Sequence, residues 1–418
     1  MIFRYRTHVL NSVQYESTMT ERLANVGFIG LGSMGEPIAR RLARQGFPVM
    51  GCDIDPNMLA AFDEPGTQRS SDPYETARYA SLLGICVRTD EQLEALVDNG
   101  QLFEALGSGG TVILHSTVSP TLARSLSDVA ARFGVGFVDV GVSGGGPAAL
   151  DGQLSLWIGG NDADVERVKP WLEAIGKQLS HLGAVGRGQE GKLLNNLISI
   201  ANYGMSTAIV DIGLSMGFDR QQLIDALMAG SAQSFALGVG PRFVQPREGA
   251  GATGSVRGLH DLLKKDLEHA SELPTNQSLA MRHLVDAGAF MIKRLRAAEL
   301  EFSGQVTPVD PLQTVDNYFA AISAQDIDGL MVLYAEDANF TLPNGTIVNG
   351  KANIRDLHQK VFSAGAPKPV PIEKIVGSQC VAVEIEAHLP DGSVRYTTNH
   401  YRFDEMGKIL SLGVYARG

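Results

Sequence analysis

The sequence contains few cysteines. Only Cys52, Cys86 and Cys380 occur among 418 residues, and their spacing matches no metal-binding motif. This usage argues against a disulfide framework and against a structural zinc site. It is typical of a protein in a reducing compartment. We therefore expect a cytoplasmic protein without a bound metal.

Long apolar runs and basic runs are also missing. No apolar stretch is expected to span a bilayer, and the residues before Met19 lack the apolar centre of a secretory signal. The net charge of −11 and the lack of a long basic run argue against nucleic-acid and membrane partners. Residues 1–20 are expected to be a disordered lead-in, with translation starting at Met1 or Met19.

What the chain does have is enough apolar material for several cores. Of its 418 residues 44% are hydrophobic, and its 47 glycines are typical of α/β proteins with many tight turns. The pattern of strands and helices predicts three units. They are an α/β unit over residues 21–185, an all-helical unit over 186–302 and an α+β unit over 311–418, with a linker at 303–310.

A glycine-rich turn near the N-terminus predicts a dinucleotide site. Val26–Ile29 is expected to be a buried strand, and a helix with Pro37 in its first turn follows the glycines. In this context a GxGxxG motif lets the backbone approach a pyrophosphate at a helix N-terminus. The predicted cofactor-binding residues of the turn are Gly30, Leu31, Gly32, Ser33, Met34 and Gly35.

Asp53 follows the second predicted strand, at residues 48–52. A carboxylate at this position can accept hydrogen bonds from both ribose hydroxyls and would repel a 2′-phosphate. The sequence therefore predicts NAD rather than NADP. The alternative is that Asp53 only caps a helix or a turn, and Asp55 competes with it for the cofactor.

Strands and helices alternate up to about residue 185, which predicts a mostly parallel sheet with ligands at the carboxyl ends of its strands. Two loops at such ends, at residues 115–120 and 139–147, are rich in serine and glycine. Hydroxyls and backbone N–H groups of this kind can bind a small carboxylate. The alternative is ordinary turn chemistry, since Ser, Gly and Pro favour turns anyway.

The segment Gly186–Asn196 places a lysine and an amide on one helix face. Lys192 and Asn196 are four residues apart, which is one helical turn. An amine beside a carboxamide can give a proton to a carbonyl oxygen and hold the hydroxyl that forms. The apolar residues that follow predict a mostly buried helix, in which a lysine without a role is costly. A surface lysine is the alternative.

Residues from about 24 to 300 resemble the β-hydroxyacid dehydrogenases, the family of 3-hydroxyisobutyrate dehydrogenase and tartronate semialdehyde reductase. The likeness rests on the glycine turn, Ser116–Pro120, Val142–Gly145, Gly188–Asn196 and Lys265–Leu267. The resemblance implies hydride transfer between NAD and a 3-hydroxy acid, or the matching aldehyde or ketone. It implies Lys192 as general acid/base supported by Asn196, Lys265 beside the nicotinamide, and Ser116, Thr117, Ser143, Gly144 and Gly145 around the substrate carboxylate.

Two departures from the family flank the expected substrate pocket. His115 stands where the family usually has an acid, and Val140-Gly141 stands where it usually has Ala-Pro. His115 is considered as an additional ligand for an anionic or larger substrate. The alternative is a histidine packed at the end of its strand.

Residues 311–418 resemble the NTF2-like (SnoaL-like) cone and, within it, ketosteroid isomerase. Tyr318 falls on the oxyanion-hole tyrosine of that enzyme and Asn399 on its protonated aspartic acid, so the two donors are expected to line a pocket. Leu342 occupies the position of the catalytic base and cannot move a proton. Alternatives are a core in which the two groups bond each other or water, or a cone that only dimerises.

Three other functions are considered. An imine or ketone reductase with a bulky substrate would typically carry Asp or Tyr in place of Lys192. A non-enzymatic scaffold would typically lack the lysine, and a bifunctional protein would use the cone as an isomerase or dehydratase. The resemblances also imply a small carboxylate substrate and a homo-oligomer, either a dimer or a tetramer.

Overall fold

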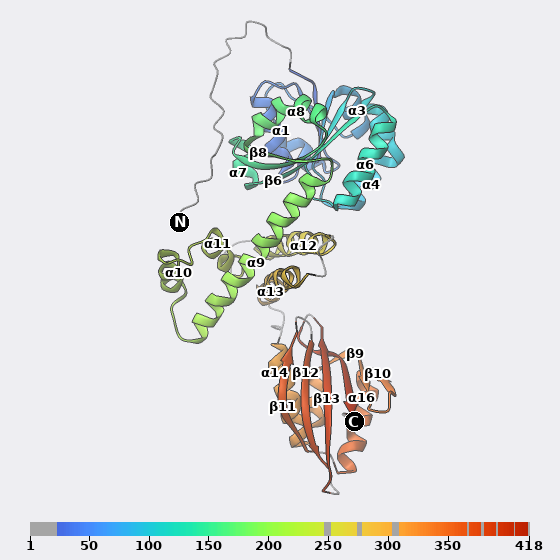
Figure 1. The fold of residues 1–418 in the computed structure, drawn as a ribbon, viewed down its shortest axis with the longest axis vertical. Helices are drawn as coiled ribbons and strands as arrows, with labels where there is room; N and C mark the ends of the chain where they lie inside the picture. Colours follow the sequence, from blue (N-terminus) through green and yellow to red (C-terminus); the bar gives the residue numbers. More distant parts are fainter. Residues whose placement is uncertain are drawn as a thin grey trace. The chain divides into compact units, whose positions relative to one another are not determined.

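The computed structural model describes residues 23–245, 252–273, 278–302, 309–365, 368–377, 380–389, 392–404 and 406–416. The chain divides into two compact units, Met1–Lys192 and Leu193–Gly418. Figure 1 shows the elements of each. The expected lead-in over residues 1–20 and most of the expected linker at 303–310 lie outside the described residues.

An eight-stranded sheet forms the centre of the first unit (Figure 1). Its strands are β1 Val26–Ile29, β2 Val49–Cys52, β3 Gln68–Ser70, β4 Leu82–Ile85, β5 Thr111–Leu114, β6 Gly136–Ser143, β7 Leu154–Gly159 and β8 Gly176–Gly183. They lie in the order β3-β2-β1-β4-β5-β6-β7-β8. The first six strands run parallel, while β7 runs antiparallel to β6 and pairs in parallel with β8. The order 3-2-1-4-5-6 is that of dinucleotide-binding domains.

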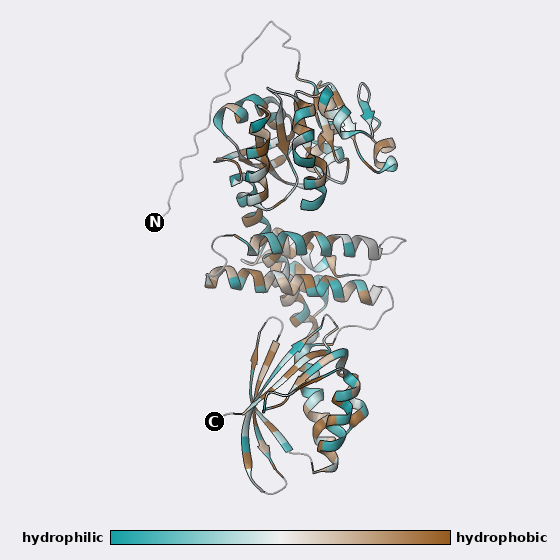
Figure 2. Ribbon diagram, turned by 90° about the vertical axis from the view of Figure 1, so that its right-hand side faces the viewer, coloured by the Kyte–Doolittle hydropathy of each residue, from teal (hydrophilic) through white to brown (hydrophobic). Residues whose placement is uncertain are grey.

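Helices cover both faces of this sheet. They are α1 Gly35–Arg44, α2 Pro56–Ala61, α3 Pro73–Tyr79, α4 Asp90–Val97, α5 Gln101–Leu106, α6 Pro120–Arg132, α7 Gly145–Leu150 and α8 Asp162–Ile175. All residues of β1, β2, β4 and β5 are buried, as expected of a parallel sheet covered on both sides. Two separate apolar clusters result, one around Phe28 and Trp171 and the other around Phe103 and Phe137. Figure 2 shows the hydrophobic colour in the interior of this unit, between its helices.

Two strands of the first unit have no counterpart in the sequence analysis. Strand β3 has three residues, two of them exposed, and β8 has no fully buried residue. Both lie at the ends of the sheet. The hydrophobic pattern does not predict these two strands, because an end strand that is exposed to solvent needs no row of apolar residues.

The second unit begins with helices. They are α9 Arg187–Ser215, which starts within the first unit, α10 Arg220–Ala229, α11 Phe235–Phe243, α12 Ala252–Ser271 and α13 Leu279–Phe302. Leu197 and Ile200 of α9 share an apolar cluster with Leu267 and Met291. This region is all-helical as expected, and α11 was not predicted.

Helix α9 is less buried than the sequence suggested. Large apolar side chains are exposed along it and just beyond its end, namely Leu194, Ile198, Met205, Ile209, Ile212 and Met216. The expectation of a mostly buried helix is therefore wrong for this chain. By length and composition α9 could also cross a membrane, contrary to expectation, although one such helix is weak support because core helices have the same composition.

The C-terminal part of the second unit is a curved sheet with helices on one side (Figure 1). Its helices are α14 Pro311–Ala324, α15 Ile327–Val332 and α16 Lys351–Ser363. Its strands are β9 Tyr334–Thr341, β10 Ile347–Asn349, β11 Lys368–Val376, β12 Cys380–His388, β13 Val394–Phe403 and β14 Ile409–Ala416. The strand order is β10-β9-β14-β13-β12-β11.

Strands β11 to β14 form an antiparallel meander, and β9 joins it in parallel with β14. Val383, Ile385 and Tyr401 of the inner face pack with Val315 and Phe319 of α14 in one cluster. Strands β9, β10 and β11 were not predicted. Strand β9 begins at Tyr334.

Candidate functional site

The glycine turn after β1 has the geometry that a bound pyrophosphate requires. Gly30 has φ +93°, and a β carbon there would lie 2.3 Å from the carbonyl oxygen of Cys86. A β carbon on Gly35 would lie 1.9 Å from the carbonyl oxygen of Gly30, whereas one on Gly32 would meet nothing within 4 Å. The first and third glycines therefore allow close backbone packing, and the second faces open space.

Asp53 is tied to this turn. Its carboxylate accepts hydrogen bonds from the backbone N–H of Leu31 at 2.7 Å and of Asp55 at 2.8 Å. Asp55 instead caps α2, accepting from the backbone N–H of Asn57 at 2.8 Å. The structure thus brings Asp53, and not its competitor, to the glycine turn. Its two oxygens keep lone pairs for ribose hydroxyls.

A buried carboxylate fixes the start of the lysine-bearing helix. Asp139 on β6 is completely buried and accepts from the backbone N–H groups of Gly186 at 2.8 Å and Gln189 at 2.7 Å. Burial raises the pKa of Asp139 to about 6, while the two backbone hydrogen bonds lower it. The residue satisfies N–H groups at the beginning of α9 that the helix itself cannot bond.

Gln189 connects this helix to the serine loop after β5. Its side chain is fully buried; Nε2 donates to the carbonyl oxygen of Ser116 at 2.9 Å, and Oε1 accepts from the backbone N–H of Val118 at 3.1 Å. The Ser116 hydroxyl accepts from the N–H of Val87 at 2.8 Å and can still donate its own hydrogen. Thr117 lies between the two residues that Gln189 holds.

Asp139 and Gln189 were not among the predicted site residues. The signal was available: Asp139 interrupts an otherwise apolar strand, and Gln189 stands three residues before Lys192. A buried carboxylate within an apolar strand is costly unless hydrogen bonds satisfy it.

Lys192 is partly buried and packs against β6 and β7. A β carbon at Gly141 would lie 2.5 Å from the β carbon of Lys192, so only glycine fits opposite it. The ammonium nitrogen lies 5.9 Å from the centre of the Trp157 ring. The glycine at position 141, which departs from the family pattern, therefore makes room for the lysine stem.

The second loop follows directly from β6. Gly144 and Gly145 have φ values of +137° and +77°, which disfavour any residue with a β carbon. A β carbon at Gly146 would lie 3.0 Å from the carbonyl oxygen of Ser33. Ser143 at the end of β6 and the glycines after it thus lie beside the cofactor turn, where a substrate carboxylate could meet backbone N–H groups.

Two predicted site residues lie in the second unit. Asn196 donates from Nδ2 to Asp266 at 2.7 Å and accepts from Asn195 at 3.1 Å. Lys265 lies 3.7 Å from the other carboxylate oxygen of Asp266. Asp266 is 3% exposed and was not predicted, although it stands inside the Lys265–Leu267 motif. It fixes the orientation of the Asn196 carboxamide.

His115 is packed inside the core of the first unit. Its ring is 3% exposed and stacks near Phe28 and Trp171, with ring centres 6.0 and 5.9 Å away. Nδ1 is 3.3 Å from the carbonyl oxygen of Val140, and Nε2 accepts from the Trp171 indole at 3.2 Å. Burial lowers the pKa of His115 to about 4. These contacts favour the packed histidine over the substrate ligand, because both ring nitrogens are already used.

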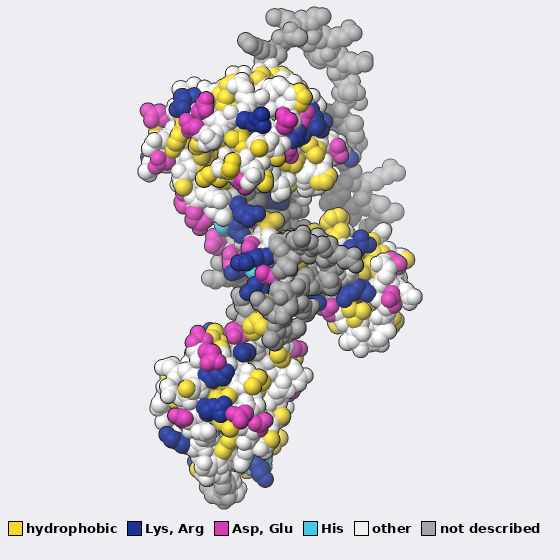
Figure 3. Space-filling view, turned by 180° about the vertical axis from the view of Figure 1, so that it is seen from behind, with side chains coloured by type: hydrophobic (Ala, Val, Ile, Leu, Met, Phe, Trp, Pro, Cys, Tyr) yellow, Lys and Arg dark blue, Asp and Glu magenta, His cyan; other side chains and the backbone are white. Residues whose placement is uncertain are grey.

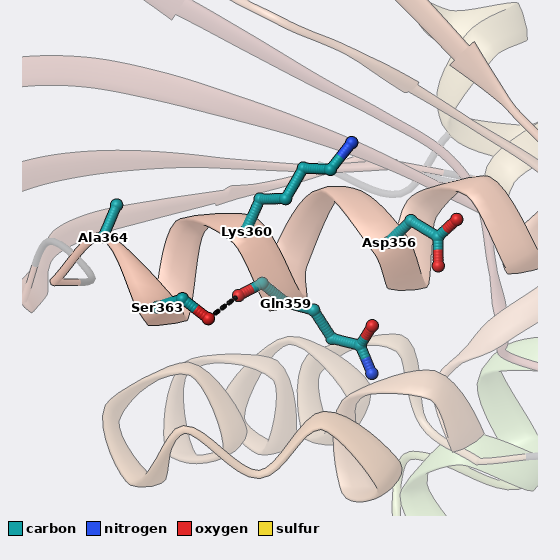
Figure 4. A pocket seen from close by; sticks show the side chains of 5 residues that line it. All are labelled: Asp356, Gln359, Lys360, Ser363 and Ala364. Carbon is teal, nitrogen blue, oxygen red and sulfur yellow. Dashed lines mark hydrogen bonds between the residues drawn. The ribbon is translucent and has the colours of Figure 1, made fainter.

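Both residues predicted for the cone pocket line one cavity of about 240 Å³, Tyr318 from α14 and Asn399 from β13. Leu342 also lines it. A second hollow lies on the surface of α16. Figure 4 shows that its side chains come from that helix and from Ala364 directly after it, with the Ser363 hydroxyl donating to the carbonyl oxygen of Gln359 at 2.8 Å. In the described ranges, no group of three or more His, Cys, Asp or Glu residues could hold a metal ion.

Comparison with known proteins agrees with this architecture. Residues 25–183 match the NAD binding domain of 6-phosphogluconate dehydrogenase, and residues 315–412 match the SnoaL-like domain. Mouse mitochondrial 3-hydroxyisobutyrate dehydrogenase is 32% identical over 213 residues, 50% of this chain and 63% of that protein. A probable mitochondrial 3-hydroxyisobutyrate dehydrogenase from Dictyostelium discoideum is 30% identical over 228 residues, 54% of this chain and 70% of that protein.

Among solved structures, Psf3 in complex with NADP+ and 2-OPP is 26% identical, with a TM-score of 0.56, and the match covers 67% of this chain and 99% of that one. The fold and the glycine turn define a protein that binds a nicotinamide cofactor. The chain belongs to the 3-hydroxyisobutyrate dehydrogenase family, and its residues 315–412 match a SnoaL-like domain. It spans 63% of the length of the mouse enzyme.

Proposed function

We propose that this protein is an NAD-dependent dehydrogenase of a 3-hydroxy acid, or a reductase of the matching aldehyde or ketone, with Lys192 as general acid/base. The observation that carries the proposal is the placement of Lys192. It extends from a helix whose first turn is held by Asp139 and Gln189, and Gln189 also holds the loop of Ser116. A proton-transfer group and a carboxylate-binding loop are thereby fixed to each other.

Each group of residues has its own role in the proposed reaction. The loops of Ser116–Thr117 and Ser143–Gly145 bind the substrate carboxylate through hydroxyl and N–H groups. Lys192 accepts the proton of the substrate hydroxyl during oxidation and returns it to the carbonyl oxygen during reduction. Asn196, oriented by Asp266, supports the substrate hydroxyl, and Lys265 serves the cofactor side. The nicotinamide, when bound, supplies the hydride chemistry.

NAD is proposed as the preferred cofactor because Asp53 presents a carboxylate at the glycine turn. A 2′-phosphate would bring negative charge close to this group. NADP+ in the related Psf3 structure makes NADP the alternative to test.

The decisive experiment follows reduced cofactor spectrophotometrically with a panel of 3-hydroxy acids and, in reverse, the matching aldehydes, ketones and cyclic imines. Lys192→Ala should lower kcat by roughly 10²- to 10⁴-fold, the usual contribution of a general acid/base, while cofactor binding persists. Lys177→Ala, on exposed β8, is the matched control and should keep full activity. Full activity of Lys192→Ala would remove the proposed role. Turnover of imines but not hydroxy acids would favour the imine-reductase alternative.

Cellular setting and assembly are also proposals. A net charge of −11 supports a cytoplasmic protein without nucleic-acid or membrane partners, and Figure 3 shows acidic and basic side chains interspersed over one face. The exposed apolar residues of α9, such as Ile198 and Ile209, support association with a second copy. Light scattering after gel filtration should give a dimer or tetramer; a monomer at micromolar concentration would contradict this.

The cone is proposed to bind a ligand or to dimerise. The bifunctional alternative, in which it acts as an isomerase or dehydratase, has less support because Leu342 lines its cavity at the position of the expected base.

A further inference from the structure

The cavity of the SnoaL-like domain is apolar over most of its wall. Helices α14 and α16 contribute side chains from one side and the inner face of the sheet from the other. The apolar lining includes Phe319, Ile322, Phe340, Leu342, Leu357 and Phe362. Its volume of about 240 Å³ corresponds to roughly eight molecules of liquid water. The space therefore suits an apolar body of about that many non-hydrogen atoms.

In the part of the chain that the structure describes, two of the polar side chains on this wall have an atom without a hydrogen-bond partner. Asn399 is 5% exposed and His358 is 4% exposed, and both line the cavity. Within the described residues, Oδ1 of Asn399 and Nε2 of His358 are buried without a hydrogen-bond partner. Buried polar atoms of this kind are costly and are normally satisfied. Hydrogen-bonding groups on a bound molecule would satisfy them.

The chemistry of the pair defines these groups. Burial lowers the pKa of His358 to about 4, so the ring is neutral near pH 7 and Nε2 can carry a single hydrogen. The Nε2–H group can donate to a ligand oxygen, and Oδ1 of Asn399 can accept from a ligand hydroxyl. The other end of the Asn399 carboxamide donates to the Tyr401 hydroxyl at 3.1 Å.

A carbonyl ligand can be accommodated by one rearrangement. If the Asn399 carboxamide turns over, Nδ2 faces the ligand and Oδ1 accepts from the Tyr401 hydroxyl, which is both donor and acceptor. The site can therefore take an oxygen either as a hydroxyl or as a carbonyl.

The opposite end of the cavity carries a positive charge. Arg395, Thr397 and Asn399 alternate along β13 and all line the cavity, so they share one face of the strand. Arg395 is exposed while Asn399 is buried. Four residues of extended strand span about 13 Å. A ligand held by Asn399 could thus place an anionic group near Arg395 only if an apolar segment separated its two ends.

We propose that the SnoaL-like domain binds a small amphipathic carboxylate that carries a hydroxyl or carbonyl group at the far end of an apolar body. Asn399 and His358 bind the oxygen inside the cavity, and Arg395 binds the carboxylate at its mouth. This proposal is independent of the dehydrogenase activity, because no cofactor or hydride step enters it.

The test is isothermal titration calorimetry on the full chain without cofactor. Three probes separate the contributions: ω-hydroxyoctanoate, octanoate without the hydroxyl, and octane-α,ω-diol without the carboxylate. The hydroxy acid should bind more tightly than either of the other two. Asn399→Leu should weaken ω-hydroxyoctanoate by roughly 10-fold or more, the usual effect of losing a buried hydrogen bond, but not octanoate. Arg395→Gln should weaken both carboxylates and spare the diol.

Lys360→Gln, on the surface of α16, is the control and should change none of the three affinities. Thermal unfolding of each variant verifies that the domain is folded. Equal loss of all probes in a folded Asn399→Leu would overturn the assignment of the polar end. Absence of binding for every probe, together with a higher Tm for Asn399→Leu, would mean that the cavity holds only water and would overturn the proposal.

Discussion

The buried carboxylate of Asp139 accepts a hydrogen bond from the backbone N–H of Gln189 at 2.7 Å, three residues before Lys192. The same Gln189 holds Ser116 and Val118 through its side chain. The proposed proton-transfer residue and the proposed carboxylate loop are therefore coupled through two fully buried side chains, those of Asp139 and Gln189. This arrangement makes Asp139 a positioning residue.

Asp139→Asn should lower kcat by about 10- to 100-fold, because small displacements of a reacting group cost factors of this size. Both carboxylate oxygens of Asp139 accept from backbone N–H groups, and in asparagine one of these oxygens is replaced by an NH2 group, which cannot accept. Cofactor binding should be retained, which separates misplacement of Lys192 from general unfolding. Asp162→Asn, at an exposed carboxylate, is the control. An unchanged kcat in folded Asp139→Asn would contradict the positioning role.

Asp53→Ser should shift cofactor preference toward NADP, measured as the ratio of kcat/KM for the two cofactors. The substitution removes the charge that would repel a 2′-phosphate. Asp55→Ser keeps a capping hydroxyl on α2 and should leave the ratio unchanged. The assignment fails if the unmodified protein already prefers NADP, or if both variants change the ratio equally.

Gly141→Ala should impair activity more than cofactor affinity. The added β carbon would lie 2.5 Å from the β carbon of Lys192 and displace its stem. Steady-state kinetics and cofactor titration measure the two effects separately. Gly258→Ala, where the new carbon meets nothing within 4 Å, should be neutral or slightly stabilising in helix α12. Normal kcat in Gly141→Ala would show that the lysine tolerates the shift.

Stability should fall as the pH drops from 6.5 toward 4. His115 and His358 have folded-state pKa values lowered to about 4 by burial, from an ordinary value of 6.5. Their neutral forms stabilise the fold above pH 6.5, and this contribution is lost as the pH falls through the folded-state value. The loss amounts to roughly 3 kcal/mol per ring at about 1.36 kcal/mol per pKa unit.

Urea unfolding of each unit across this range measures the effect. His358→Phe should flatten the pH dependence of the SnoaL-like domain alone, and His115→Asn that of the first unit alone. Asp139 acts in the opposite direction, since its pKa is raised from 3.8 to about 6, and its contribution is lost as the pH rises through 6. If either histidine variant lost stability at acid pH as steeply as the unmodified protein, the pH dependence of stability would have to come from other groups.

The elements around the cofactor turn could be predicted because their pattern is local. The glycines after β1, the charge of Asp53 and the alternation of apolar strands with helices lie within short stretches of sequence. Long-range relations could not be predicted in this way: the bonds from Asp139 to Gly186 and from Gln189 to Ser116 join residues 47 and 73 positions apart. The two alternatives for His115 could not be separated from the sequence, because an unusual residue at a strand end looks the same whether it binds substrate or fills a core.

The end strands show a related limit. Strands β3, β8 and β11 have largely exposed residues, so no hydrophobic alternation marks them. Burial, which the sequence pattern reports, is only one of the two conditions for a strand. The other is a partner for its backbone, which depends on where the neighbouring strand lies.

Strand β11 affects how readily the SnoaL-like domain aggregates in a crowded solution. It is an open margin of the sheet, where unsatisfied backbone groups invite strands from other molecules. Pro369 and Pro371 remove two N–H donors from this margin, and the register shifts immediately after Pro371. The same strand that completes the sheet is thus a poor template for another one, which protects the domain from edge-to-edge aggregation.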